Sequence, residues 1–344
     1  MKIGNIEYRR GERVFAYLET DRTASEIPVS IPVNILCGPE DGPTLVVDAA
    51  IHGNENVGSV ALGQLLRNID VSKIRGTLIV VPVVNTSGYE FQQREVKWDG
   101  KDLNRQGGGS PDGTAAQRLA YGYFNEVVAK AEAFVDIHSG GTDGHVFYTF
   151  YESHLQGTKP EVIERSKEMG LAFGLSDVFC ETPWPGTFEE VALKHGIPSI
   201  SVEIGGGSDW RRYGQVFVDL CEQGVRNVMI LFGMLDGKIV PQAPTAKIWR
   251  ITHEIFSGNY QGFFLRNPAL GPEFGMPVNK GDTYGTMYHP FTGAKLGDII
   301  YPADGYLLHS ARLWPVIPRN RFLTIIGNLV EEIDLSRSSL AGLL

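Results

Sequence analysis

The feature that most limits the fold of this sequence is an alternation, between Thr44 and Phe232, of short apolar runs with longer amphipathic segments. The apolar runs have the length and residue types of buried strands; they span residues 44–50, 77–84, 133–137 and 199–203. The amphipathic segments are predicted helices; they span residues 57–68, 115–130, 160–170, 188–195 and 214–232. Strands that alternate with helices need crossover connections. The pattern therefore predicts an α/β fold with a parallel or mixed sheet covered by helices on both faces.

The pattern changes after Gly233. Residues 236–244 contain a glycine and two prolines and are typical of a linker. Short β-type runs follow, without any long helix-period stretch; they span residues 262–265, 298–301, 305–308 and 322–326. We therefore predict two domains, an α/β domain over 1–235 and a smaller all-β domain over 236–344. The first 43 residues also look β-rich and are expected to extend the α/β sheet or its edge.

Composition excludes several classes of protein. With 344 residues, 42% of them hydrophobic and 21% charged, the chain can bury a sizeable core. Its net charge of −9 argues against a nucleic-acid binder, which needs clustered Lys and Arg. No signal-like segment opens the chain, and no apolar stretch approaches 18 residues. Its three cysteines are far apart in the sequence, which is typical of reduced thiols. We expect a cytoplasmic protein with no nucleic-acid or membrane partner.

The first candidate site residues directly follow the first predicted strand, in Ala50-Ile51-His52-Gly53-Asn54-Glu55. Sites in open α/β sheets gather at the carboxyl ends of strands. A tight turn between His52 and Glu55 would aim both side chains at one ion, and imidazole and carboxylate both bind zinc. An isolated His-x-x-Glu pattern is weak evidence, because each residue could serve a surface or capping role.

Two further polar residues end predicted strands in the same way. His138 follows the third apolar strand and precedes Ser-Gly-Gly, and Glu203 ends the strand Ser-Ile-Ser-Val. A carboxylate at the end of such a strand is costly to bury without a partner. Each residue alone has a structural explanation, but the four together favour a divalent metal site, provided that their strands are neighbours.

A third segment completes the pattern. Asp102-Leu103-Asn104-Arg105 places an amide beside a planar guanidinium, a pair suited to gripping a carboxylate, and Arg94 precedes it. Taken alone, such a tetrapeptide is usually a solvated loop.

The chain resembles the aspartoacylase/succinylglutamate desuccinylase family, a branch of the zinc-carboxypeptidase superfamily. The resemblance rests on the order of four motifs: His52-Gly-Asn-Glu55, Asp102-Leu-Asn-Arg105, Asp-Ile-His138-Ser-Gly, and Glu203 before glycines. It covers most of the chain, including a C-terminal β domain, and is strongest to the larger bacterial members, among them the deacetylase-like proteins of ectoine breakdown. It implies that 1–235 is a zinc-hydrolase catalytic domain with a zinc-carboxypeptidase-like sheet.

The resemblance also implies a role for each residue. It implies that one zinc ion per chain is bound by His52, Glu55 and His138, and that Glu203 is the general base. Asp102 would orient the first histidine and Arg94 would polarise the scissile carbonyl, while Asn104 and Arg105 would hold a substrate carboxylate. One difference concerns the substrate pocket: the family commonly continues Asp-Leu-Asn-Arg with one residue and then Phe-Pro-Gly, whereas this chain has Gln-Gly-Gly-Gly-Ser-Pro.

The leading hypothesis is a zinc-dependent amidohydrolase that removes an acyl group from an N-acyl amino acid or a related small amide. One rival is a metallocarboxypeptidase that trims peptides with the same chemistry. A second is a non-catalytic zinc- or ligand-binding protein on the same scaffold. The sequence leaves open the acyl group, the amine portion, the oligomeric state and whether manganese, cobalt or iron replaces zinc.

Overall fold

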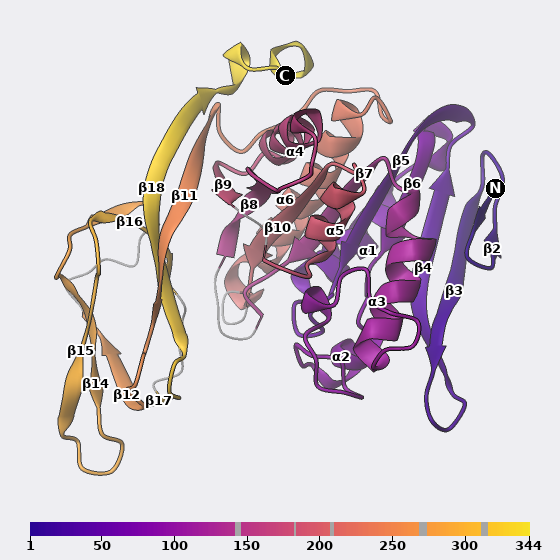
Figure 1. Ribbon diagram of the computed structural model, residues 1–344. Coiled ribbons are helices and arrows are strands. Elements are labelled where there is room, and N and C mark those ends of the chain that lie inside the picture. The colour runs from indigo at the N-terminus through magenta and orange to yellow at the C-terminus, as the bar shows by residue number, and fades with distance from the viewer. Residues whose placement is uncertain (142–145, 182–183, 207–209, 268–273, 311–315) are drawn as a thin grey trace.

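A single mixed sheet runs through the molecule (Figure 1). The computed structural model describes residues 1–141, 146–181, 184–206, 210–267, 274–310 and 316–344, and over these residues the sheet has twelve strands. From one edge to the other they are β13 (Met276–Val278), β16 (Gly305–Ser310), β18 (Phe322–Asp334), β11 (Thr245–Phe256), β9 (Asp177–Glu181), β8 (Val146–Glu152), β10 (Ser199–Gly205), β7 (Ala133–His138), β5 (Glu40–Ala49), β6 (Arg75–Val81), β4 (Pro28–Cys37) and β3 (Arg13–Arg22).

Helices cover both faces of the part of the sheet formed by β3 to β10. They are α1 (Val57–Asn68), α2 (Thr86–Phe91), α3 (Ala115–Glu126), α4 (Pro160–Phe173), α5 (Phe188–Lys194) and α6 (Trp210–Leu231). Local signals fix several of their ends. Thr114 and Gln117 form a capping box that starts α3. Pro160 opens α4, and Gly174, with φ of 98°, ends it in the left-handed conformation.

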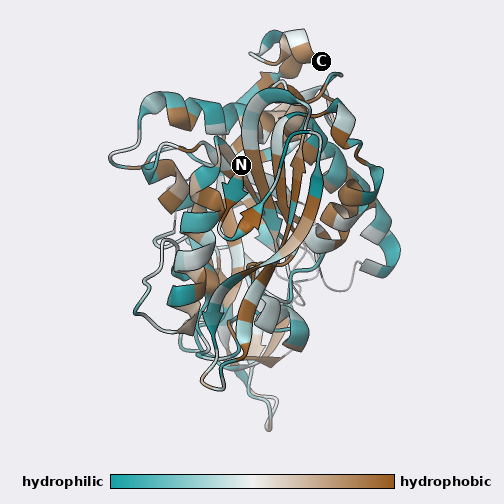
Figure 2. Ribbon diagram, turned by 90° about the vertical axis from the view of Figure 1, so that its right-hand side faces the viewer, coloured by the Kyte–Doolittle hydropathy of each residue, from teal (hydrophilic) through white to brown (hydrophobic). Residues whose placement is uncertain are grey.

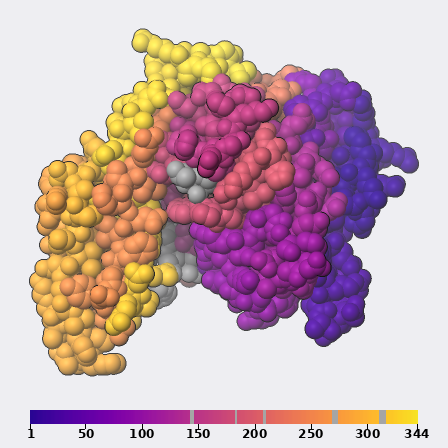
Figure 3. Space-filling view, in the orientation of Figure 1, coloured from indigo at the N-terminus to yellow at the C-terminus, as the bar shows by residue number. Residues whose placement is uncertain are grey.

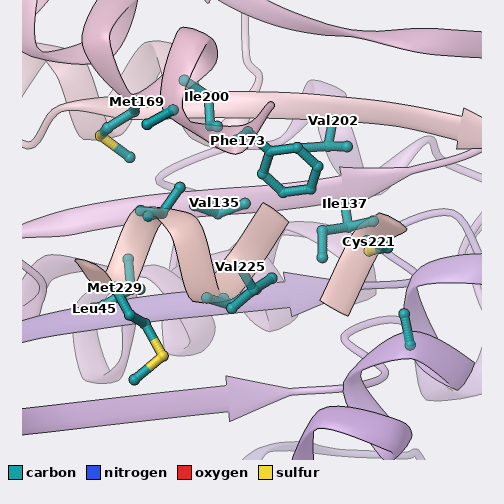
Figure 4. Close-up of a cluster of buried hydrophobic side chains, with 14 of the residues drawn as sticks. Leu45, Val135, Ile137, Met169, Phe173, Ile200, Val202, Cys221, Val225 and Met229 are labelled. Carbon is teal, nitrogen blue, oxygen red and sulfur yellow. The ribbon is translucent and has the colours of Figure 1, made fainter. Parts of the chain in front are cut away.

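Side-chain alternation along the central strands divides the core into two layers. Val135 and Ile137 of β7 pack with α1, α4 and α6, whereas Phe134 packs with α3 and α5. Figure 4 shows the first layer, in which Val135, Ile137, Ile200 and Val202 lie among side chains such as Phe173. Figure 2 shows apolar residues concentrated on the strands inside the molecule and polar residues on the outer helices and loops. The same alternation places the polar residues of β7 on the α3 and α5 side.

The C-terminal strands form antiparallel structure that continues the main sheet. β11 pairs in parallel with β9 and then antiparallel with β18, so the sheet crosses from one half of the chain to the other without a break. A second, four-stranded sheet lies beyond it, in the order β15 (Lys295–Ile300), β14 (Thr283–Tyr288), β12 (Gly262–Arg266) and β17 (Val316–Ile317). A two-stranded hairpin, β1 (Lys2–Ile3) and β2 (Ile6–Glu7), lies near the N-terminus.

The predicted fold class is confirmed: a helix-flanked mixed sheet with a C-terminal antiparallel β region. The N-terminal residues extend the sheet edge through β3 and β4, as expected. The division at 235/236 stays a prediction, because the sheet is continuous across it. All three cysteines are described, and they are buried and free. Among the described helices, none has both the length and the apolar character to cross a bilayer.

Candidate metal and catalytic site

The loop after β5 brings His52 and Glu55 together. The backbone turns sharply at Ala50, where φ is +52°, and the amide of Glu55 donates a hydrogen bond of 3.0 Å to the carbonyl of His52. Gly53 lies against the backbone of Gly88, and a Cβ at Gly53 would come within 1.9 Å of that carbonyl carbon. Only glycine fits there, so the His-Gly-Asn-Glu turn is held tightly in place. Both His52 and Glu55 are buried, at 4% and 5% exposure.

His138 and Glu203 come from two neighbouring parallel strands. β7 lies between β5 and β10, and Glu203 is the direct partner of His138 in the register. Alternation along each strand turns both side chains to the same face of the sheet. The condition set by the sequence, that these strand ends be neighbours, is therefore met.

Three ligand-type atoms meet at one point, from His52, Glu55 and His138. The Nδ1 atoms of the two histidines are 3.1 Å apart. The Nδ1 of His52 lies 3.0 Å from Oε1 of Glu55, and the Nδ1 of His138 lies 2.9 Å from Oε2 of Glu55. Zinc bonds of about 2.0–2.1 Å in tetrahedral directions place neighbouring ligand atoms about 3.3 Å apart. The distances among the two Nδ1 atoms and the carboxylate oxygens of Glu55 are only slightly shorter than this spacing.

The outer nitrogens of both rings explain why a cation fits. Nε2 of His52 lies 3.0 Å from the carboxylate of Asp102, and Nε2 of His138 lies 2.9 Å from that of Asp136. An outer nitrogen that donates its proton to its carboxylate leaves Nδ1 with a lone pair that can face Glu55. Two lone pairs and a carboxylate then face one another, an arrangement that a divalent cation satisfies. The donor set, two imidazoles and one carboxylate, is typical of catalytic zinc.

Arg94 and Asp102 support this cluster from the side. Nε of Arg94 donates to Asp102 over 3.1 Å, and its Nη1 donates to Glu55 over 3.1 Å. Burial raises the pKa of Asp102, but His52 and Arg94 outweigh burial and hold that pKa below its ordinary value. Asp102 is therefore ionised and fixes the orientation of His52. Arg94 reaches both cavities beside the site.

Asn104 and Arg105 lie on a short 3₁₀ turn (Leu103–Arg105) that follows Asp102. Asn104 is 5% exposed; its Oδ1 accepts from the amide of Phe188, and its Nδ2 lies 3.2 Å from Nε2 of His138. Arg105 is exposed, donates to the carbonyl of Asn104, and stacks on Trp184 at 5.5 Å. Both residues line the inner cavity, and their substrate-binding role stays a prediction.

Glu203 lies beside the three ligand candidates but is not one of them. It lines both cavities, and its carboxylate accepts no hydrogen bond from the described part of the chain. Burial raises the pKa of Glu203 to about 7. A carboxylate with that pKa can both take and return a proton near neutral pH.

Sequence reasoning missed two residues that border the site. Asp136 orients His138, and the signal for it was available: two residues apart on one strand, Asp and His share a face. Tyr148 on β8 is the other register partner of Glu203 and lines both cavities. Burial, and then Glu203 and Glu55, raise the pKa of Tyr148 well above its ordinary value. Its hydroxyl therefore stays protonated and can offer a hydrogen bond.

Two spaces that share five described lining residues adjoin the cluster. The outer one is a cleft of about 510 Å³ that both halves of the chain line. From the C-terminal half it receives Glu254 and Phe256 of β11, and Phe322 and Ile325 of β18. In Figure 3 the surface is hollowed along the same boundary. The inner space is a chamber of about 70 Å³ against β8 and β10. Arg94, Arg105, Tyr148, Trp184 and Glu203 border both spaces.

One protein family matches the α/β part of the chain. The family described as the succinylglutamate desuccinylase/aspartoacylase catalytic domain matches residues 41–232. A curated relative, the N-alpha-acetyl-L-2,4-diaminobutyric acid deacetylase of Halomonas elongata, is 24% identical over 311 residues. That match covers 89% of this chain and 87% of the relative.

Solved structures share the fold over nearly the whole length. A succinylglutamate desuccinylase/aspartoacylase from Rhodobacter sphaeroides has a TM-score of 0.82 at 23% identity, covering 95% of this chain and 98% of that one. The product-bound ectoine utilization protein EutE (DoeB) from Ruegeria pomeroyi has a TM-score of 0.81 at 23% identity, covering 95% and 100%. Both matches include the C-terminal β region.

Proposed function

This chain belongs to the succinylglutamate desuccinylase/aspartoacylase family, and on that premise we propose that it is a zinc-dependent amidohydrolase that removes the acyl group from an N-acyl amino acid. The observation that carries the proposal is the meeting of three candidate zinc ligands, on His52, Glu55 and His138, beside the carboxylate of Glu203, which has no hydrogen-bond partner among the described residues. The first three would bind zinc, and the fourth is free to move a proton.

When bound, zinc would supply a Lewis acid that polarises the scissile carbonyl and makes a water molecule more acidic. Glu203 takes a proton from the attacking water and returns it to the leaving nitrogen, which completes the cleavage of the amide. Its pKa of about 7 suits both halves of this transfer. Because its carboxylate has no partner among the described residues, no hydrogen bond within the protein need break as it gains or loses the proton.

Arg94 acts on the carbonyl oxygen. Asp102 and Glu55 hold its guanidinium at the border of both cavities and leave part of its N–H edge open. A fixed donor at this point stabilises the negative charge that develops on oxygen, and removing such a donor typically lowers the rate by about 10²–10³-fold.

Arg105 holds the carboxylate of the amino acid. It has no carboxylate partner within the described residues, and the indole of Trp184 stacks on it. An exposed guanidinium fixed in this way suits bidentate recognition of a carboxylate. Binding of the substrate carboxylate by Arg105 would hold the scissile amide beside the cluster of His52, Glu55 and His138, in an orientation suited to reaction.

Two observations favour a small substrate over a peptide. Side chains of β11 and β18 line the outer cleft, so the C-terminal strands limit the space in front of the cluster. The curated relative from Halomonas elongata carries the name of a deacetylase of an N-acetylated amino acid. A peptidase would need room for a chain that continues beyond the scissile bond.

The test is metal analysis followed by an activity screen. We expect about one zinc ion per chain, and zinc-dependent hydrolysis of at least one N-acetyl, N-succinyl or N-formyl amino acid. Activity should disappear with a chelator and return with added zinc. Faster cleavage of blocked dipeptides would support a carboxypeptidase instead. A zinc-loaded protein that cleaves neither class would support a non-catalytic binding protein.

A further inference from the structure

Strand order places three side chains of the site in one row across the sheet. β8, β10 and β7 are consecutive strands; Tyr148 pairs with Glu203, and Glu203 pairs with His138. Register partners point to the same face of a sheet, and neighbouring strands lie about 4.8 Å apart. Glu203 therefore stands between the other two. Tyr148 lies on the side of the proposed catalytic base that faces away from the metal cluster.

The hydroxyl of Tyr148 is a well-positioned donor that the proposed reaction does not use. Its ring stacks on Phe179, with centroids 4.1 Å apart and planes 11° from parallel. The side chain lines both cavities, and its hydroxyl makes no hydrogen bond within the part of the chain that the structure describes. Burial, and then nearby carboxylates, raise the pKa of Tyr148, so the hydroxyl keeps its proton. A ligand in the cavities can therefore accept a hydrogen bond from it.

Arg105 lies on the same side of Glu203 as Tyr148. Its guanidinium stacks on Trp184 at 5.5 Å, and Trp184 in turn stacks on Phe150, with centroids 6.1 Å apart. Phe150 is two residues from Tyr148 on β8, so both side chains project from the same face of the strand. Through Trp184, Arg105 is therefore held over β8. Arg105 and Tyr148 also line the same two cavities.

The other arginine of the site lies on the metal side of Glu203. Arg94 donates to Glu55 and to Asp102, and the proposed function places the carbonyl oxygen of the substrate there. In the same reaction the leaving nitrogen receives its proton from Glu203. A substrate with its carbonyl on the metal side and its nitrogen at Glu203 continues toward β8. The amino acid portion therefore lies beside Tyr148.

We propose that the hydroxyl of Tyr148 binds the carboxylate of the N-acyl amino acid together with Arg105. The inference rests on the proposed function, because it takes the direction of the substrate from that reaction. Arg105 supplies positive charge, and Tyr148 supplies a directed donor to a carboxylate that can accept several hydrogen bonds. Glu203 and Glu254 also border the outer cleft and disfavour a second anion. A donor beside Arg105 offsets part of that repulsion.

The test removes the hydroxyl and the carboxylate separately. Each N-acyl amino acid that the zinc-loaded protein cleaves is compared with the matching N-acyl amine, in which hydrogen replaces the carboxylate. Tyr148→Phe keeps the ring that stacks on Phe179. We expect it to lower kcat/KM at least tenfold for the amino acid, chiefly through a higher KM, and to leave the amine within threefold. Equal losses on both compounds would place the hydroxyl at the reacting carbonyl or the base. That result, or no loss on either, would overturn the assignment.

Tyr151→Phe is the matched control. Tyr151 lies on the same strand but packs in the core layer on the opposite face of the sheet, and it lines neither cavity. Loss of its hydroxyl should leave KM for both compounds within threefold of the unaltered protein. A rise in KM as large as that in Tyr148→Phe would mean that disturbance of β8, and not contact with the carboxylate, weakens binding, and the assignment would fall.

Calorimetry of the zinc-loaded protein with N-acetyl, N-succinyl and N-formyl amino acids separates this inference from the proposed function. Suppose that none is cleaved, but that one binds and loses at least tenfold affinity in Tyr148→Phe while its carboxylate-free counterpart is unchanged. The proposed function then fails and the carboxylate contact stands. If compounds are cleaved but Tyr148→Phe changes neither KM nor affinity, the contact fails and the proposed function stands. If none is cleaved and none binds, both fail.

Discussion

Asp136 offers the sharpest test of how the cluster is built. It accepts a hydrogen bond from Nε2 of His138 over 2.9 Å, and both side chains are buried. This bond fixes which ring nitrogen carries the proton, and it leaves Nδ1 free to bind the metal. In Asp136→Asn the shape is kept, but the charge is lost. The new amide can also present its NH₂ group to Nε2, which would move the ring proton to Nδ1.

The expected loss follows from that contact. Removing a carboxylate that orients a metal-binding histidine typically weakens metal affinity by about 10–100-fold, which corresponds to about 1.4–2.7 kcal/mol. The fold should survive, because asparagine has the same shape as aspartate and remains buried at the same position. The change should therefore appear in the zinc dissociation constant more than in the melting temperature of the metal-free protein.

The assay is competition for zinc with a chelator of known affinity, with Asp48→Asn as the control. Asp48 is equally buried and is the register partner of Asp136 on β5, but it accepts from Tyr123 and not from His138. Burial and Asp136 raise the pKa of Asp48 well above its ordinary value, so Asp48→Asn replaces a neighbouring buried carboxyl without touching the ring of His138. We expect its zinc affinity to stay within threefold of the unaltered protein. Equal losses in the two variants, or no loss in Asp136→Asn, would refute the view that the hydrogen bond positions His138.

Three further predictions follow from the site. Glu203→Gln should lower kcat by about 10²–10⁴-fold in steady-state assays, yet bind zinc within threefold of normal, because Glu203 is not among the three ligand candidates. Arg105→Ala should raise KM at least tenfold for N-acyl amino acids and leave N-acyl amines without a carboxylate nearly unaffected, as measured side by side. Removal of zinc should lower the melting temperature by several degrees, because a ligand at 100 times its dissociation constant stabilises the fold by about 2.7 kcal/mol. Thermal unfolding of the protein with and without added zinc measures this shift.

Much of the site could be predicted from the sequence because it obeys local rules. Apolar runs identified β5, β7 and β10, and a polar residue directly after or at the end of each run marked the carboxyl ends of these strands. Since parallel neighbours end at one edge of a sheet, His52, His138 and Glu203 could be grouped before the strand order was known. That order, with β7 between β5 and β10, is a tertiary property, and the structure supplied it.

Asp136 and Tyr148 were missed for different reasons. The sequence analysis considered polar residues at the ends of strands, whereas Asp136 lies inside an apolar strand, two residues before the histidine whose Nε2 it faces. Tyr148 lies on β8, a strand that the sequence analysis did not identify. β8 runs antiparallel to β10, so it breaks the alternation on which the strand predictions relied. Tyr148 borders the site because it is the register partner of Glu203 on β10, and that pairing is a tertiary property.

The role of the C-terminal region shows most clearly why local patterns are insufficient. The short β-type runs after residue 260 suggested a separate domain, yet the long strand β11 joins the catalytic sheet at β9 and carries Glu254 and Phe256 to the outer cleft. Such a placement depends on pairing between residues about seventy positions apart, as in Trp249 with Phe179. Because the wall of the cleft and the sheet that bears the ligand candidates are one hydrogen-bonded structure, the wall cannot swing away without breaking strand pairs. The fold thus limits the space in front of the cluster, and under the proposed function we expect this restriction, more than any of the proposed zinc ligands, to favour a small amide over a peptide chain as the substrate.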